Sequence, residues 1–255
     1  MERSRFSERK PDFLLLIATL ILVTIGTVMI YSSSSILAME RFKDGQYFLK
    51  KHLFFVVLGL ALMALAARIN YVKLQKLAYP GIVLSLVLLA VLFVPGMGIR
   101  AGGAKRWLHL GVFSFQVAEM AKLAVVVFLA HILAKKADHL KEFRHGVLIP
   151  LLSILVVVCL ILPQPDFGTA LIILTIMMMM LFLAGSRVLH LAALAAAFIP
   201  IGAWLVLHKS YRLERLMTFL DPWKDPQHSG FQIIQSLLSF GSGGTFGVGI
   251  GDGMQ

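Results

Sequence analysis

The sequence predicts an all-α fold, a polytopic bundle of helices that cross a membrane. Hydrophobic residues make up 58% of the 255 residues, charged residues make up only 15%, and the mean hydropathy is +0.85. A soluble globule of this composition would have too little polar surface. The chain also contains a series of apolar runs of roughly the 20 residues that a helix needs to span a bilayer.

About seven such runs follow one another, each predicted to be one span. They centre on residues 13–31, 53–67, 77–94, 117–134, 147–162, 169–184 and 188–207. The first run follows Arg3, Arg5, Arg9 and Lys10, as in a signal peptide. It is too long for a cleaved hydrophobic region and has no clear A-x-A site, so we expect it to remain as the first helix.

The distribution of basic residues favours a cytoplasmic N-terminus. This orientation places about twelve Lys and Arg residues on the cytoplasmic side, in loops such as 68–76 and 135–145, against about seven in the first three outer loops. We expect a single integral membrane domain over residues 1–255, in which residues 209–255 begin a large loop on the outer face. Because the segment 231–240 is apolar and amphipathic, we expect further spans to follow.

The charge and the cysteine content exclude several classes of function. The net charge is +11, but the basic residues are spread over short loops beside helices, which is typical of contact with lipid headgroups rather than with nucleic acid. Cys159 is the single cysteine and falls in an apolar run. We therefore expect no nucleic-acid binding, no disulfide and no zinc site.

The fourth apolar run carries polar residues three apart. Gln116, Glu119 and Lys122 share one face of the predicted helix, about two turns into the membrane from its outer end. Charges inside a membrane commonly pair with one another, so one interpretation is a structural ion pair. The alternative is the wall of a polar cavity that meets a charged headgroup.

Asp166 lies where the fifth predicted helix must end and the sixth begins. It follows Pro163 and Pro165, and the simplest role for its carboxylate is to cap the free N–H groups of the next helix. Capping does not explain the neighbouring Gln164 and Gly168. A rigid turn that carries a carboxylate also suits a binding or catalytic site.

Three arginines in predicted outer segments are candidates for phosphate binding. Arg212 and Arg215 lie three apart on a predicted extension of the seventh span, where they either bind phosphate oxygens or extend towards the headgroups as interfacial cations. Arg106 lies in the loop 102–111, which combines glycines, two cations and Trp107. We expect this segment to be a flexible basic loop.

These segments together resemble the SEDS family of cell-wall glycosyltransferases (shape, elongation, division and sporulation proteins), and its division branch more than its elongation branch. The resemblance covers essentially the whole chain. The matching segments are 103–108 with 110–111, 115–116, 119–122, 164–169 (Gln-Pro-Asp-Phe-Gly-Thr), 211–215, 219–223 and 230–236 leading into 241–244. The family usually has Pro and Ser where this chain has Val117 and Ala118, a difference that removes no charge.

The resemblance implies about ten spans and an activity at the outer face of the bacterial inner membrane. The implied reaction is polymerisation of lipid II, an undecaprenyl-pyrophosphate-linked disaccharide-pentapeptide, into peptidoglycan during cell division. A carboxylate would accept the proton of the attacking sugar hydroxyl, while cations or a divalent metal ion stabilise the leaving pyrophosphate. The implied partners are a class B penicillin-binding transpeptidase and other division proteins.

From the residues present, we predict a substrate-binding site formed by Arg106, Glu119, Lys122, Asp166, Arg212 and Arg215. The cations would bind the anionic headgroup, and the two carboxylates would orient those cations or hold the acceptor sugar. The family's proposed catalytic aspartate falls beyond Gln255, so we expect no catalytic residue, and no turnover, in residues 1–255 alone. Two alternatives remain open: a transporter that flips lipid II, and a non-catalytic scaffold of the division machinery.

Overall fold

The computed structural model describes residues 12–101, 104–110, 113–245 and 247–249. The basic N-terminal residues 1–11 and the final residues up to Gln255 lie outside these ranges. Contacts divide the chain into two compact units, one formed by Ile69–Leu205 and the other by Met1–Arg68 together with Val206–Gln255. Each unit is described by itself.

The unit formed by Met1–Arg68 and Val206–Gln255 begins with a helical hairpin. Helix α1 (Phe13–Phe42) starts at Asp12, whose carboxylate accepts hydrogen bonds from the backbone N–H groups of Leu14 and Leu15. It ends at Lys43, and α2 (Tyr47–Ala67) follows after a short turn. Shorter elements complete the unit: α8 (Ser210–Leu220), the 3-10 turn η4 (Pro222–Lys224) and α9 (Phe231–Gly243).

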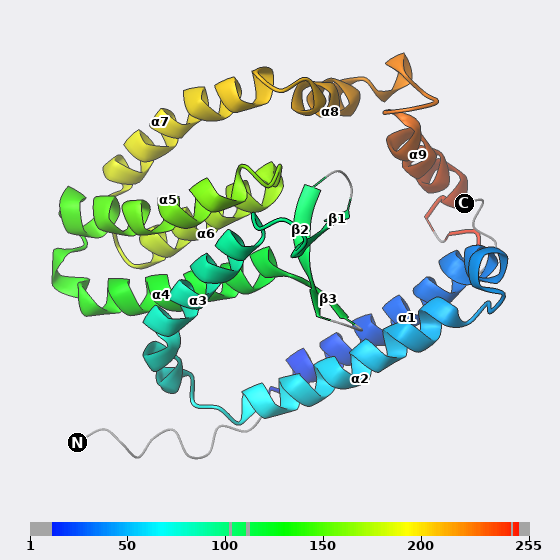
Figure 1. Ribbon diagram of the computed structural model, residues 1–255, viewed down its shortest axis with the longest axis horizontal. Helices are drawn as coiled ribbons and strands as arrows, with labels where there is room; N and C mark the ends of the chain where they lie inside the picture. Colours follow the sequence, from blue (N-terminus) through cyan, green and yellow to red (C-terminus); the bar gives the residue numbers. More distant parts are fainter. Residues whose placement is uncertain (1–11, 102–103, 111–112, 246, 250–255) are drawn as a thin grey trace. The chain divides into compact units, whose positions relative to one another are not determined.

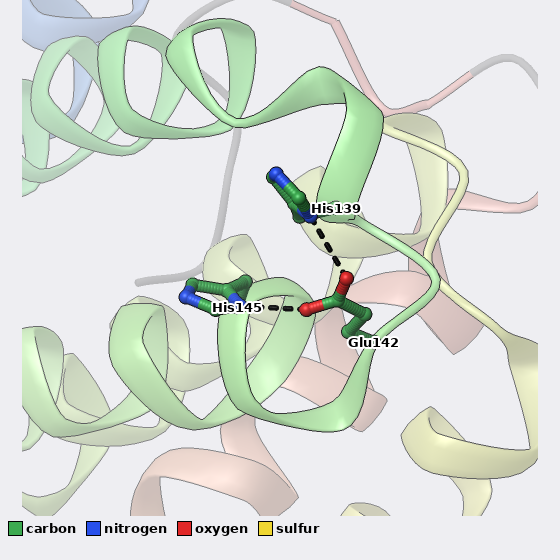
Figure 2. A group of neighbouring side chains, drawn as sticks. All are labelled: His139, Glu142 and His145. Atoms are coloured by element: carbon green, nitrogen blue, oxygen red, sulfur yellow. Dashed lines mark hydrogen bonds and ion pairs between the residues drawn. The ribbon is translucent and has the colours of Figure 1, made fainter.

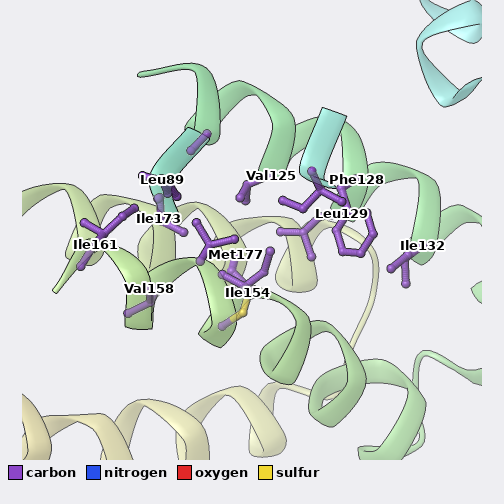
Figure 3. Close-up of a cluster of buried hydrophobic side chains, with 14 of the residues drawn as sticks. Leu89, Val125, Phe128, Leu129, Ile132, Ile154, Val158, Ile161, Ile173 and Met177 are labelled. Carbon is purple, nitrogen blue, oxygen red and sulfur yellow. The ribbon is translucent and has the colours of Figure 1, made fainter. Parts of the chain in front are cut away.

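The unit Ile69–Leu205 holds the main hydrophobic core. Its helical elements are η1 (Tyr71–Leu77), α3 (Ala78–Val91), α4 (Val117–Lys135), η2 (Ala137–His139), the π-helical turn η3 (Arg144–Leu148), α5 (Ile149–Ile161), α6 (Phe167–Leu183) and most of α7 (Val188–Leu207). Helices α3 to α6 lie side by side (Figure 1). Figure 3 shows the side chains that fill the space between them, among them the fully buried Leu129, Ile154 and Met177.

The predicted spans agree with the observed helices. Within the described residues, six helices are long and apolar enough to cross a membrane, and the apolar helix α6 is slightly shorter, at 17 residues. The first span is longer than the predicted 13–31, because α1 continues to Phe42. The chain is therefore a multi-pass membrane protein with a helical fold.

The expectation of a flexible loop over 102–111 is wrong. Strands β1 (Gly98–Ala101), β2 (Ala104–Leu110) and β3 (Phe113–Gln116) form an antiparallel sheet in the order β1-β2-β3. Leu108 is buried and lies opposite Phe115, which also packs against the core. A cross-strand apolar pair seated on the helices fixes the register and gives a small sheet the support that an isolated hairpin lacks.

Candidate functional site

One end of the unit Ile69–Leu205 gathers predicted site residues from three segments. The strands lie at the end of the bundle where α3 and α5 finish and where α4 and α6 begin (Figure 1). We call this the sheet end. Arg106 on β2, the pair Glu119 and Lys122 on α4, and Asp166 before α6 all belong to it.

A β-bulge sets the position of Arg106. The pairing of β2 with β1 steps from Trp107–Ile99 to Lys105–Arg100, so Arg106 is the extra residue on its strand. A bulge bends the strand locally and turns a side chain away from the regular alternation. The Arg106 guanidinium reaches the segment that precedes α6, where it donates hydrogen bonds to the backbone oxygens of Gln164 (3.4 Å) and Pro165.

Gln164 attaches the same segment to a second element. Its side-chain amide donates a 3.2 Å hydrogen bond to the backbone oxygen of Leu89 near the end of α3, and the residue is buried. A buried amide that loses such a partner costs free energy, so this bond holds the segment against α3. The turn before α6 is thus held from one side by α3 and from the other by β2.

Asp166 is the buried acid of this end. Its Oδ1 accepts a 3.2 Å hydrogen bond from the backbone N–H of Thr169, which confirms the predicted capping role for α6. Its Oδ2 lies 3.6 Å from the Nε of Arg106, an ion-pair distance, yet this buried oxygen accepts no hydrogen bond from the described residues. An acceptor of this kind is costly to leave unsatisfied, which makes it a candidate for binding a ligand hydroxyl or water.

Glu119 and Lys122 form a separate ion pair on one helix. Their charged atoms are 2.8 Å apart, with 24% of the Lys122 side chain and 56% of the Glu119 side chain exposed. Glu119 lies in the first turn of α4, closer to the helix end than predicted, because Gln116 belongs to β3 and only precedes the helix. In the described part of the chain, no hydrogen bond or ion pair links this pair to Arg106 or Asp166.

Arg212 and Arg215 belong to the other unit. Both lie on α8, which begins after α7 as predicted. The Arg212 guanidinium donates a 2.8 Å hydrogen bond to the Tyr211 hydroxyl and also stacks near that ring, while Arg215 is exposed. Their predicted role in phosphate binding stays a prediction.

Among the described residues, three carboxyl groups outside the membrane-spanning helices have a lowered pKa. Hydrogen bonds are the main cause in each: from Lys50 to Asp44, from His139 and His145 to Glu142, and from the Ser229 backbone to Asp225. Each hydrogen bond favours the ionised form of its acceptor. None of the three belongs to the sheet end.

Sequence reasoning did not find the contacts that organise this end. Gln164 and Leu89 are 75 residues apart, and Arg106 and Pro165 are 59 apart, so no helical or strand period connects them. A weak signal for the strands was present, since Lys105, Trp107 and His109 alternate with Arg106, Leu108 and Leu110.

Comparison with known proteins decides the family. The family model that covers FtsW, RodA and SpoVE, described as cell cycle protein, matches residues 13–255. The chain belongs to this SEDS family. The resemblance drawn from the motifs is therefore confirmed.

Relatives of known name agree with this assignment. The chain is 41% identical to the probable peptidoglycan glycosyltransferase FtsW of Geobacter sp. (strain M18), over 96% of this chain and 66% of that protein. It is 38% identical to the stage V sporulation protein E of Bacillus subtilis (strain 168), over 96% of this chain and 67% of that protein. The chain thus spans about two thirds of the length of these SEDS proteins.

Solved structures share the fold. A chain in a peptidoglycan synthase complex, whose structure concerns the coordination of polymerisation and crosslinking, matches with a TM-score of 0.71 and 33% identity, over 92% of this chain and 66% of that one. The rod shape determining protein RodA of Thermus thermophilus matches with a TM-score of 0.53 and 29% identity, over 72% of this chain and 58% of that one.

Proposed function

We propose that the full-length protein is a peptidoglycan glycosyltransferase that polymerises lipid II in the bacterial inner membrane during cell division, and that the sheet end helps to bind the substrate's diphosphate and sugar. The names of its SEDS relatives support the reaction class. The proposed orientation has a cytoplasmic N-terminus, which places the sheet end at the outer face. The proposed partner is a class B penicillin-binding transpeptidase, in keeping with the synthase complex that shares this fold.

The observation that carries the proposal is the pairing of Arg106 with the buried carboxylate of Asp166. A guanidinium carries five N–H donors, and among the described residues protein acceptors engage the Nε and one terminal nitrogen. The donors that remain can bind diphosphate oxygens with the fork geometry that suits arginine. Asp166 Oδ2 can accept a hydrogen bond from a sugar hydroxyl.

In this proposal Asp166 positions groups and does not transfer the proton. One of its oxygens caps α6 and the other faces a guanidinium, so the carboxylate is held as a fixed acceptor. The general base is assigned to the aspartate that the family resemblance places beyond Gln255. Lys122, oriented by Glu119, is proposed as a second cation for the headgroup.

The test measures glycan polymerisation by the full-length protein, reconstituted with its transpeptidase and fluorescent lipid II. We expect Arg106→Ala to lower kcat/KM by roughly a hundredfold, since removing one preorganised charge-stabilising donor commonly costs that much. Lys50→Ala is the matched control, because Lys50 also pairs with a carboxylate, at 2.8 Å, but is exposed in the first turn of α2. Equal activity of the two variants would refute the proposed role of Arg106.

The same reconstituted vesicles separate the alternative functions. A transporter would move lipid II across the bilayer without forming polymer, and a scaffold would bind the transpeptidase and do neither. Arg212→Ala and Arg215→Ala test the other unit independently. Turnover and lipid II affinity that stay unchanged in both variants would remove these arginines from the substrate site.

A further inference from the structure

Two histidines and one glutamate converge in the segment that joins α4 to α5. Figure 2 shows the Glu142 carboxylate between two imidazole rings, with His139 Nδ1 2.8 Å from one carboxylate oxygen and His145 Nδ1 2.7 Å from the other. The three side chains offer ligand atoms that all lie within 4.8 Å of one another. Among the described residues, this is the one group of three or more such side chains with that spacing.

The backbone holds these three residues in place. The Glu142 N–H donates to the His139 carbonyl at 3.0 Å, and the Gly146 N–H donates to the Glu142 carbonyl at 2.8 Å. Leu140 is buried between them and anchors the turn to the hydrophobic core. The Ser186 hydroxyl, which follows α6, donates to the Gly146 carbonyl at 3.2 Å and ties the turn to a third segment.

Gly146 shows how closely the turn is packed. A Cβ atom at this position would lie 1.9 Å from the Leu140 carbonyl oxygen, so only glycine permits the close approach of the two backbones. Gly146 also belongs to the π-helical turn η3, and π-helical turns are frequent at functional sites. The ligand atoms are therefore presented by a turn that needs little rearrangement to bind an ion.

The chemistry of the donor set selects the kind of ion. Two imidazole nitrogens and one carboxylate oxygen match the ligands of Zn²⁺ and neighbouring transition metals, whereas Mg²⁺ and Ca²⁺ prefer oxygen alone. The side chains are 58% (His139), 53% (Glu142) and 32% (His145) exposed, so water has access to a fourth coordination position. On binding, each neutral imidazole would move its proton to the nitrogen that faces away from the ion.

We propose that His139, Glu142 and His145 form a binding site for a transition-metal ion of the Zn²⁺ type, at the end of the helix bundle opposite the sheet end. The site departs from our expectation that the sequence contains no zinc site. It is independent of the proposed enzymatic function, because it uses none of the residues assigned to the substrate. A bound ion would fasten the end of α4 to the start of α5.

The chain contains a natural comparison for this site. His228 Nδ1 lies 3.1 Å from an oxygen of Asp225 with the same spacing of three residues, but the second carboxylate oxygen is engaged by the backbone and hydroxyl of Ser229. This pair supplies one imidazole, whereas the proposed site supplies two. It should bind a transition metal far more weakly than the proposed site.

The experiment uses the purified full-length protein in nanodiscs, with any polyhistidine tag removed. Zn²⁺ binding is measured by titration calorimetry, and Co²⁺ binding by its visible absorption spectrum, which reports coordination by nitrogen and oxygen. We expect one site that EDTA empties. His139→Ala and His145→Ala should each weaken it by about tenfold or more, because loss even of an outer group that supports a metal ligand costs that much.

Glu142→Gln and His228→Ala complete the test. Glutamine keeps the size of the side chain and an oxygen acceptor but lacks the charge, so Glu142→Gln should also weaken binding, while His228→Ala should leave it unchanged. All variants should melt like the parent in EDTA, which separates loss of the site from loss of the fold. The proposal would be overturned if the parent bound no stoichiometric metal ion, or if His139→Ala and His145→Ala bound it with the affinity of the parent.

Discussion

The sheet end contains two ion pairs that differ in what they hold together. Lys122 and Glu119 are only 2.8 Å apart but lie on the same helix, with more than half of the glutamate side chain exposed. Arg106 and Asp166 are 3.6 Å apart, yet they join β2 to the start of α6, and only 8% of the Asp166 side chain is exposed. We therefore expect burial and the elements joined, rather than the shortest distance, to decide which pair contributes more to stability.

The largest expected effect is that of Arg106→Ala. It removes two hydrogen bonds to backbone oxygens and leaves the buried Asp166 carboxylate without its cation. We expect the free energy of unfolding to fall by about 2–4 kcal/mol, in the range for breaking a largely buried pair. It is measured by SDS titration in mixed micelles. If Arg106→Ala lowered the free energy of unfolding no more than Lys122→Ala does, the Arg106–Asp166 pair would not be the more important of the two pairs.

A double-mutant cycle sharpens this result. Asp166→Asn keeps an acceptor for Thr169 but removes the charge, so the coupling between Arg106→Ala and Asp166→Asn isolates the ionic part. The matched cycle combines Lys122→Ala with Glu119→Gln. We expect the first coupling energy to exceed the second.

The next effect in size is that of Gln164→Leu. The substitution preserves the volume of the side chain approximately but removes the 3.2 Å hydrogen bond to the Leu89 carbonyl. We expect a loss of about 1–2 kcal/mol in the free energy of unfolding, because a buried acceptor loses its partner. The measurement is the same SDS titration, with Gln235→Leu on α9 as a control. A neutral result would show that Arg106 alone holds the turn before α6.

Lys122→Met should have a smaller effect. A partly exposed pair three residues apart on a helix contributes less than about 1 kcal/mol, and Glu119 keeps its favourable place in the first turn of α4. SDS titration should therefore give values close to those of the parent. A loss comparable to that of Arg106→Ala would mean that the polar face of α4 is buried in the folded protein in lipid.

The smallest effect concerns the exposed pair of Asp44 and Lys50. The Lys50 hydrogen bond, with help from the Gln46 backbone, holds the pKa of Asp44 below its ordinary value of 3.8. Because the folded pKa is lowered, the stabilisation is present above pH 3.8 and is lost as the pH falls through the lowered pKa. Parent and Asp44→Asn should differ slightly at pH 7 and converge in acid. High salt should also diminish the difference.

The helices could be predicted from the sequence because each span carries its own signal. The apolar run of 188–207 and the helix Val188–Leu207 coincide, since the length and composition of one segment suffice to predict a span. Asp166 as a helix cap was also predictable, because capping depends on residues three apart. The sheet was missed because short strands with weak alternation give little signal without the core on which Leu108 packs.

The connections within the candidate site could not be predicted. The bulge at Arg106, the bond from Gln164 to Leu89 and the ion pair with Asp166 all depend on which helices become neighbours. The cluster around Glu142 depends on a turn geometry that Gly146 permits, and the printed sequence shows only a spacing of three. Tertiary packing determines the first three of these contacts, and the geometry of one turn determines the cluster.

The long separation between Arg106 and its acceptors has a consequence for biosynthesis. The acceptor at Pro165 is translated 59 residues after Arg106, and α4 and α5 lie between them. A nascent chain that has inserted only as far as α4 therefore exposes an arginine whose acceptors have not yet entered the membrane. Water and lipid headgroups must solvate this guanidinium until α5 has inserted. The turn before α6 can then supply the backbone acceptors of Arg106.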